Sequence, residues 1–197
     1  MPYIQRSKSL LRPALLFQGG IVVVALVAIA VFGVEVKTGG QSPLRALALG
    51  SLAALGMFVL LFGLSRLPGL FPSRLKRHAK DLYDFVSGFP IAGIVALAVL
   101  AGVGEELFFR AFIQGGLAGF TNNITAVLVA SIIFGLAHFL SFAYFLVATL
   151  MGALLGTAYA LSDSILLVMV WHSVYDLIAL LALIKFPHWL KIEEGPR

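Results

Sequence analysis

The chain has 197 residues, of which 60% are hydrophobic and only 12% are charged, and its formal net charge is +5. A chain this small and this apolar cannot hide its hydrophobic surface from water, which excludes soluble globular, disordered and fibrous proteins. We therefore predict an all-α, polytopic membrane helical bundle, formed by a single integral membrane domain over residues 1–197. The absence of cysteine excludes disulfides, Cys-ligated metals and thiol nucleophiles, and no signature of nucleic-acid binding is present.

Long apolar runs predict about six membrane-spanning helices. The two N-terminal runs cover about 15–34 and 46–65, and Ser42-Pro43 before the second is typical of a helix start. The other four runs cover about 91–117, 124–140, 142–161 and 164–186. No proline lies between Ile91 and Phe186, so we expect no kink in these helices. The pairs Gly115 and Gly119, and Gly152 and Gly156, have the spacing that lets membrane helices approach closely.

Basic residues predict the orientation in the membrane. Most of them lie in three segments: the N-terminal tail, the connection between the second and third runs, and the C-terminal tail (Arg6, Lys8, Arg12, Arg66, Arg74, Lys76, Arg77, Lys80, Lys191, Arg197). If the chain crosses the membrane six times, these three segments lie on the same side. Since Lys and Arg accumulate in cytoplasmic loops, we expect a multi-pass protein of the cell membrane with both termini in the cytoplasm. Ala28-Ile29-Ala30 resembles a signal-peptide cleavage site, but the run is long for a signal peptide, and we favour a retained first span.

Six ionisable side chains fall within the interiors of the apolar runs, away from their ends, and all of them lie in the second half of the chain: Glu105, Glu106, Arg110, His138, His172 and Asp176. A charge at the bilayer centre costs about 2.5–3.5 kcal/mol on insertion scales, so these residues must face one another or a wet cavity. Glu106 and Arg110 are four residues apart and share a helix face. His172 and Asp176 have the same spacing, so the carboxylate is expected to orient the imidazole. His78 and His188 lie among loop charges and are expected to be surface residues.

A purely structural interpretation remains open for each group. The pair of Glu106 and Arg110 would serve for charge compensation in a packed bundle, and His138 alone would hydrogen-bond a neighbouring helix. His172 with Asp176 would then be a contact between helices. The residues alone leave the structural and the catalytic interpretation about equally favoured for the two pairs, whereas His138 alone favours the structural one.

Three motifs occur in a fixed order along the runs. Glu105-Glu106-Leu-Phe-Phe-Arg110 is an EExxxR motif, Phe134-Gly-Leu-Ala-His138 is an FxxxH motif, and His172-Ser-Val-Tyr-Asp176 is an HxxxD motif. Together they resemble the CPBP family, which includes the type II CAAX prenyl endopeptidases and the bacteriocin-immunity (Abi) proteins. The resemblance covers a catalytic core at about residues 91–183.

The resemblance implies an intramembrane endopeptidase that acts on a peptide or prenylated protein. The positions of Glu105 and His138 would activate a water, those of His172 and Asp176 would stabilise the oxyanion, and Glu106 and Arg110 would organise the site. The last position is often Asn in the family. Because an ionised Asp cannot donate to an oxyanion, we expect Asp176 to orient His172. Six spans are fewer than in the eukaryotic-type enzymes of the family, so the resemblance supports the hydrolytic chemistry more strongly than a requirement for a prenylated substrate.

A zinc ion is an open question at this point. Glu105, His138 and His172 would supply two imidazoles and a carboxylate, which suits catalytic zinc. There is no HExxH motif, however, and a metal-free route needs only a general base and oxyanion donors, so we favour the metal-free route.

Other functions remain as alternatives: a catalytically idle scaffold or immunity-type protein, a haem protein with His138 and His172 as axial ligands, and a proton-coupled transporter. One geometric difficulty also stands. If Pro90 and Asn123 both lie at membrane surfaces, Glu105 and His138 differ in depth by about 14 Å. They can meet if the third span continues to about Leu117, which places Glu105 near its middle, and the fourth span is tilted or starts below the membrane surface. The substrate and the oligomeric state cannot be predicted from the sequence.

Overall fold

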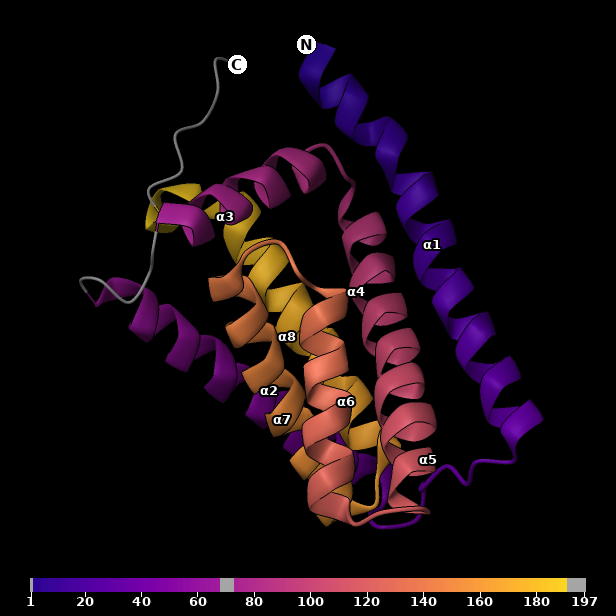
Figure 1. The fold of residues 1–197 in the computed structure, drawn as a ribbon. Helices are drawn as coiled ribbons and strands as arrows, with labels where there is room; N and C mark the ends of the chain where they lie inside the picture. The colour runs from indigo at the N-terminus through magenta and orange to yellow at the C-terminus, as the bar shows by residue number, and fades with distance from the viewer. Residues whose placement is uncertain (1, 68–72, 191–197) are drawn as a thin grey trace.

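Figure 1 shows the computed structural model, which describes residues 2–67 and 73–190, with side chains for 9–67 and 73–189. These residues form a bundle of helices and include no strand, so the predicted all-α helical bundle is confirmed. The elements are α1 (Pro2–Phe32), α2 (Pro43–Arg66), α3 (Ser73–Val86), α4 (Ile91–Glu106), the π-helix η1 (Leu107–Gln114), α5 (Gly115–Ala118), α6 (Asn123–Ala137), α7 (Phe142–Ser162), α8 (Ile165–Lys185) and the 3-10 helix η2 (Pro187–Leu190).

Five helices in the described residues are long and apolar enough to cross a membrane. They cover Ser9–Phe32, Pro43–Arg66, Ile91–Ala118, Phe142–Ser162 and Ile165–Lys185. The sixth apolar helix, α6, has only 15 residues and ends at Ala137, earlier than the predicted run at 124–140. At a rise of about 1.5 Å per residue it is about 22 Å long, shorter than a hydrocarbon core of about 30 Å.

The third span contains a feature that its sequence does not predict. The helix continues from Ile91 to Ala118 as expected, but residues Leu107–Gln114 form a π-helix. The amide of Gly115 accordingly donates to the carbonyl of Arg110, five residues earlier. Such wide turns are rare and frequently lie at functional sites. The absence of proline therefore did not guarantee a regular α-helix.

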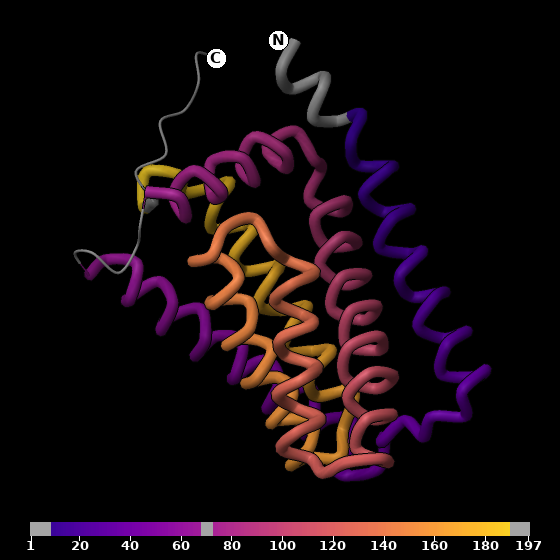
Figure 2. Tube along the Cα trace, viewed as in Figure 1, coloured from indigo at the N-terminus to yellow at the C-terminus, as the bar shows by residue number. Residues whose placement is uncertain are grey.

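Helix α8 lies at the centre of the bundle and packs mainly against α2 and α4, while α6 packs against α7 and α1 against α4 (Figure 2). Small residues allow these close approaches. A Cβ at Gly102 of α4 would lie 2.6 Å from the backbone nitrogen of Ser173 in α8, and one at Gly152 would lie 3.2 Å from Cα of Ser131 in α6. The predicted packing role of Gly152 is thus confirmed, and the tight α4–α8 contact holds the motif helices together.

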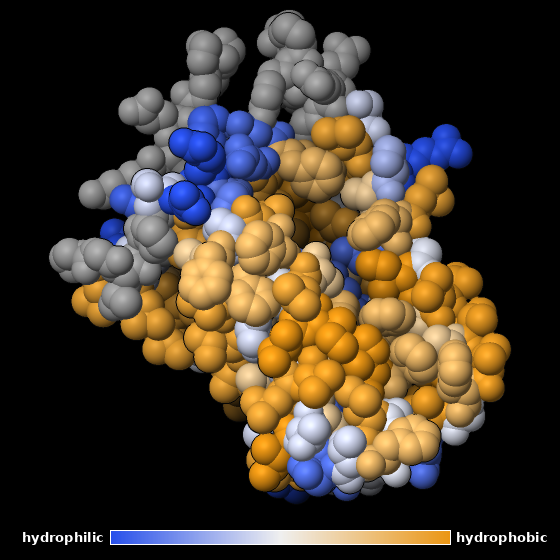
Figure 3. All heavy atoms as spheres, in the orientation of Figure 1, coloured by the Kyte–Doolittle hydropathy of each residue, from blue (hydrophilic) through white to orange (hydrophobic). Residues whose placement is uncertain are grey.

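The N-terminal end of α1, the C-terminal end of α8 and the whole of α3 lie at one end of the bundle (Figure 1). Exposed basic residues of α3 gather there, which Figure 3 shows as a hydrophilic region above a largely hydrophobic face (Arg74, Lys76, Arg77, Lys80). Lys191 and Arg197 lie outside the described residues, and for Arg6 and Lys8 only the backbone is described. At the opposite end, Lys37 Nζ lies 2.6 Å from Asp163 Oδ1 and ties the first loop to the α7–α8 turn.

Candidate active site

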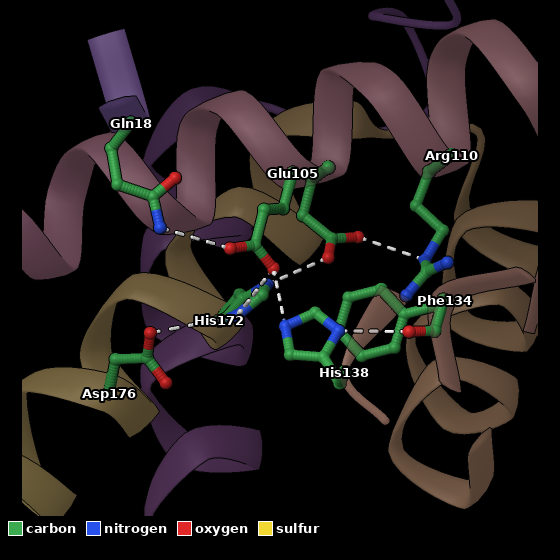
Figure 4. Close-up of polar contacts among 8 residues, drawn as sticks. Gln18, Glu105, Arg110, Phe134, His138, His172 and Asp176 are labelled. Atoms are coloured by element: carbon green, nitrogen blue, oxygen red, sulfur yellow. Dashed lines mark hydrogen bonds and ion pairs between the residues drawn. The ribbon is translucent and has the colours of Figure 1, made fainter. Parts of the chain in front are cut away.

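The buried polar cluster is built on the end of α4, where Glu105 and Glu106 follow an apolar helix. Both carboxylates are buried, Glu106 completely. His138 directly follows α6, and His172 lies near the middle of α8. Figure 4 shows the side chains of Glu105, His138 and His172 pointing toward one another. The structure therefore brings together the residues of all three motifs, which the sequence separates by up to 71 positions.

The depth difficulty disappears because of two helix lengths. The third span extends to Ala118, so Glu105 lies near its middle, as the first of the two conditions requires. Helix α6 starts at Asn123, close in sequence to the same end of that span, and ends beside His138 after about 22 Å. The end of the short helix consequently reaches the level of Glu105.

Glu105 divides its two oxygens between different partners. Oε1 accepts a hydrogen bond of 3.2 Å from Nε2 of Gln18, in α1. Oε2 lies 3.4 Å from Nε2 of His138 and 3.9 Å from Nε2 of His172. One oxygen is thus occupied by an amide, while the other faces two imidazoles.

Glu106 has a separate set of partners. Oε2 forms an ion pair of 3.0 Å with Nε of Arg110, and Oε1 lies 2.8 Å from Nδ1 of His172. The Arg110 guanidinium also lies over the ring of Phe134, 5.0 Å from its centroid, an arrangement that favours a cation. Glu106 and Arg110 are therefore paired as predicted, and the pair is linked to α8 through His172.

The hydrogen-bond partners assign the tautomers of both imidazoles. His138 Nδ1 lies 2.9 Å from the carbonyl oxygen of Phe134, which can only accept, so Nδ1 carries the hydrogen. His172 Nδ1 likewise donates to the carboxylate of Glu106. In the neutral form of each ring, Nε2 is then unprotonated and directed at Glu105 Oε2. Lone pairs on both sides of this contact repel one another, so a proton placed between them stabilises the arrangement.

The expected contact between Asp176 and His172 is present only at ion-pair distance, and the orienting role of Asp176 stays a prediction. Asp176 Oδ2 lies 3.7 Å from Nε2 of His172, beyond hydrogen-bond distance, and it is Glu106 that holds the ring through Nδ1. The i,i+4 spacing does bring Asp176 near the imidazole, but it could not reveal the competing carboxylate on another helix. Asp176 adds negative charge beside Nε2.

The cluster is closed on one side and reaches the surface on the other. The side chains of Glu105 and His172 are 8% and 6% exposed, whereas those of His138 and Asp176 are each 29% exposed. In Figure 3, hydrophilic atoms are visible in a recess of the otherwise hydrophobic face. His138 and Asp176 therefore mark the side on which the cluster is accessible from the surface.

Gln18 is the contact that the sequence reasoning missed. The first apolar run contains no ionisable residue, and it was given no chemical part. The available signal was an amide within an otherwise apolar stretch, Leu15–Val34. A buried amide in hydrocarbon needs a hydrogen-bond partner, so a polar residue there predicts a contact with another polar group.

The donor types of Glu105, His138 and His172 match those of a zinc site, and the separation of 3.4 Å between the first two suits ligands of one ion. Across the described ranges, however, no group of three or more His, Asp or Glu residues is arranged to hold a metal ion. Since His172 Nε2 lies farther from Glu105 and beside Asp176, the three predicted ligands do not form a three-donor site.

These features define a class: a multi-pass helical membrane protein with a buried cluster of glutamate, histidine and arginine. Residues 87–178 match the family model described as Type II CAAX prenyl endopeptidase Rce1-like. The match, just under half of the chain, confirms the family that the three motifs indicate, which is one of CAAX-type intramembrane proteases. Comparison with curated proteins and with solved structures gives no significant match.

Proposed function

We propose that this protein is an intramembrane endopeptidase in which Glu105 and His138 activate a water molecule. The single observation that carries the proposal is the contact of 3.4 Å between Glu105 Oε2 and His138 Nε2, made in a buried site that opens beside His138. The family match at residues 87–178 supports the class of reaction. The other four residues of the cluster hold this pair in place or balance the charge that the reaction develops.

In the first step, a proton passes from water to the pair of Glu105 and His138, and the hydroxide oxygen bonds to the carbon of the scissile carbonyl. The unprotonated Nε2 of neutral His138 and the free Oε2 of Glu105 are the acceptors for this proton. General-base catalysis of this kind contributes about 10²–10⁴-fold to the rate. The carbonyl π electrons move to oxygen and produce an oxyanion.

The charge balance favours His172 as the oxyanion donor. Three carboxylates, Glu105, Glu106 and Asp176, lie around the two imidazoles, while Arg110 supplies one permanent positive charge. A protonated His172 compensates a second negative charge, and its Nε2–H, which lies between Glu105 and Asp176, is the donor available to the oxyanion. Glu106 holds this ring through Nδ1, and Asp176 stabilises its charge. The C–N bond then breaks, and the proton taken from water passes to the leaving amine.

A peptide-cleavage assay with purified protein in liposomes tests the proposal. The substrates are C-terminal peptides with and without a prenyl group, and the variants are Glu105→Gln and His138→Ala. We expect each variant to lose at least 100-fold in kcat while still inserting into the bilayer. Matched controls are Glu35→Gln and His188→Ala, because both residues are exposed and lie outside the cluster. Full activity of either cluster variant contradicts the mechanism.

A scaffold or immunity-type protein is the second candidate, favoured by the contacts that Glu105 and Glu106 make to three other helices. In that case the polar residues serve only to hold helices together. Glu105→Gln would then lower the thermal stability in detergent and leave the biological phenotype intact. The prenylated and unprenylated peptides decide the substrate class only if wild-type protein cleaves one of them.

We propose an orientation in which α3 and both termini lie in the cytoplasm. This proposal rests on the exposed basic residues of α3. Attachment of a reporter enzyme to the C-terminus tests it. A reporter active only outside the cytoplasm should remain inactive.

A further inference from the structure

The described side chains of α1, at residues 9–32, contact the rest of the bundle along one narrow stripe. Large apolar residues on its other faces are exposed and suit contact with lipid (Leu16, Phe17, Val23, Val24, Leu26, Val27). Gln18 lies on the stripe that faces α4, together with Val22 and the buried Ala25. A lipid-facing helix therefore presents its amide side chain to the protein interior.

Glycine brings α1 close to the site. A Cβ at Gly104, the residue just before Glu105, would lie 3.4 Å from the carbonyl oxygen of Gln18 and 3.3 Å from the backbone nitrogen of Val22. Farther along the interface, a Cβ at Gly93 would lie 2.7 Å from the side chain of Leu11. The backbone of α1 thus lies against the backbone of α4 directly beside Glu105.

The hydrogen bond from Gln18 Nε2 restricts the orientation of the Glu105 carboxylate. The terminal torsion of a glutamate side chain is broad, so without a fixed partner its two oxygens exchange positions freely. Gln18 holds Oε1 at 3.2 Å, which leaves Oε2 directed at His138. Because an amide is uncharged, Gln18 fixes the carboxylate without adding another cation to the cluster that already contains Arg110.

We propose that α1, which lies outside the segment matched by the family model, completes the active site, and that Gln18 is a positioning residue for Glu105. This inference rests on the proposed function, because positioning has meaning only if Glu105 reacts. It implies that the first helix is retained in the working enzyme, since cleavage after Ala30 would remove Gln18.

The test compares Gln18→Met, which keeps the length and loses the donor, with Gln18→Glu, which places a second carboxylate against Glu105. We expect kcat to fall about tenfold in Gln18→Met with KM within twofold, and to fall further in Gln18→Glu. The matched control is Gln114→Met, which removes a buried amide that donates to the carbonyl of Gly156 at 2.8 Å. Its kcat should stay within about twofold of wild type, whatever its stability.

A second readout does not depend on activity. Gln18→Met should lower the melting temperature in the wild-type background and have little effect in the Glu105→Ala background, where the amide has already lost its acceptor. An equal decrease in both backgrounds overturns the contact and, with it, the inference.

The outcomes separate this inference from the proposed function. If wild type cleaves and Glu105→Ala does not, a wild-type kcat in Gln18→Met overturns positioning and leaves the proposed function in place. If wild type cleaves no peptide while the melting temperatures show the coupling, the proposed function and the positioning role both fail, and the contact is structural.

Discussion

Replacement of Gly102 by alanine tests whether the close approach of α4 and α8 assembles the site. An added Cβ would lie 2.6 Å from the backbone nitrogen and 2.9 Å from Cα of Ser173, the residue after His172. These atoms belong to the backbone of α8 and cannot rotate away. The substitution therefore has to separate the two helices.

The size of the displacement follows from these distances. Ordinary contacts between heavy atoms are about 3.5–4.0 Å, so the helices must move apart by about 1 Å. The contact between His172 Nδ1 and Glu106 Oε1 is 2.8 Å and would lengthen beyond hydrogen-bond distance. Misplacement by about 1 Å can lower a rate by about 100-fold, and overpacking costs about 1–3 kcal/mol of stability. We expect losses of this order in Gly102→Ala.

The assay measures peptide cleavage and the melting temperature in the same detergent. The matched control is Gly56→Ala in α2, because no atom lies within 4 Å of its added Cβ. That control should keep full activity and equal or slightly exceed wild type in stability, since alanine favours the helix over glycine by up to about 1 kcal/mol. Wild-type cleavage and melting in Gly102→Ala would refute the reasoning.

Three further predictions concern charge and metal. Arg110→Met leaves the buried carboxylate of Glu106 without its cation and should cost about 3–5 kcal/mol in chemical unfolding; a smaller loss in Arg110→Met combined with Glu106→Gln than in Arg110→Met alone checks that cause. The hydrogen bond from Lys37 to Asp163 raises the pKa of Lys37 above 10.5, so the pair stabilises the fold below that pH and ceases to do so as pH rises through the raised value. Melting of Lys37→Met and wild type should hence differ at pH 8 and converge as the pH rises through the raised pKa of Lys37, and an unchanged difference would contradict the assignment. A zinc chelator should leave cleavage unchanged because the predicted ligands do not form a three-donor group; loss of activity restored by zinc would overturn the metal-free mechanism.

The sequence was sufficient to predict helices, because uninterrupted apolar runs of about 20 residues have few other solutions in a membrane. It was also sufficient to predict that the motif residues lie close together, since buried charges must contact one another. Glu105, His138 and His172 do meet, at distances of 3.4 and 3.9 Å. The family match at residues 87–178 confirms the resemblance that ordered these motifs. Their catalytic roles stay predictions.

Contacts between distant segments could not be predicted. Spacing along one helix placed Asp176 beside His172, but the partner that holds the ring is Glu106, which is 66 residues away in the chain. Gln18 is 87 residues from Glu105, and an amide gives no charge signal in an apolar run. The π-helix at Leu107–Gln114 and the early end of α6 depend on how neighbouring helices fit, which periodicity does not record.

The short length of α6 affects how water, the second reactant of a hydrolysis, reaches the buried cluster. The four-residue connection from His138 to Ser141 lies beside the buried cluster, with Phe139 and Leu140 exposed. Irregular backbone is tolerated at that depth only where protein or water satisfies its amides and carbonyls. Because α6 ends at Ala137, His138 lies beside non-helical backbone whose polar groups water can satisfy, and water is the reactant that the proposed hydrolysis needs at His138.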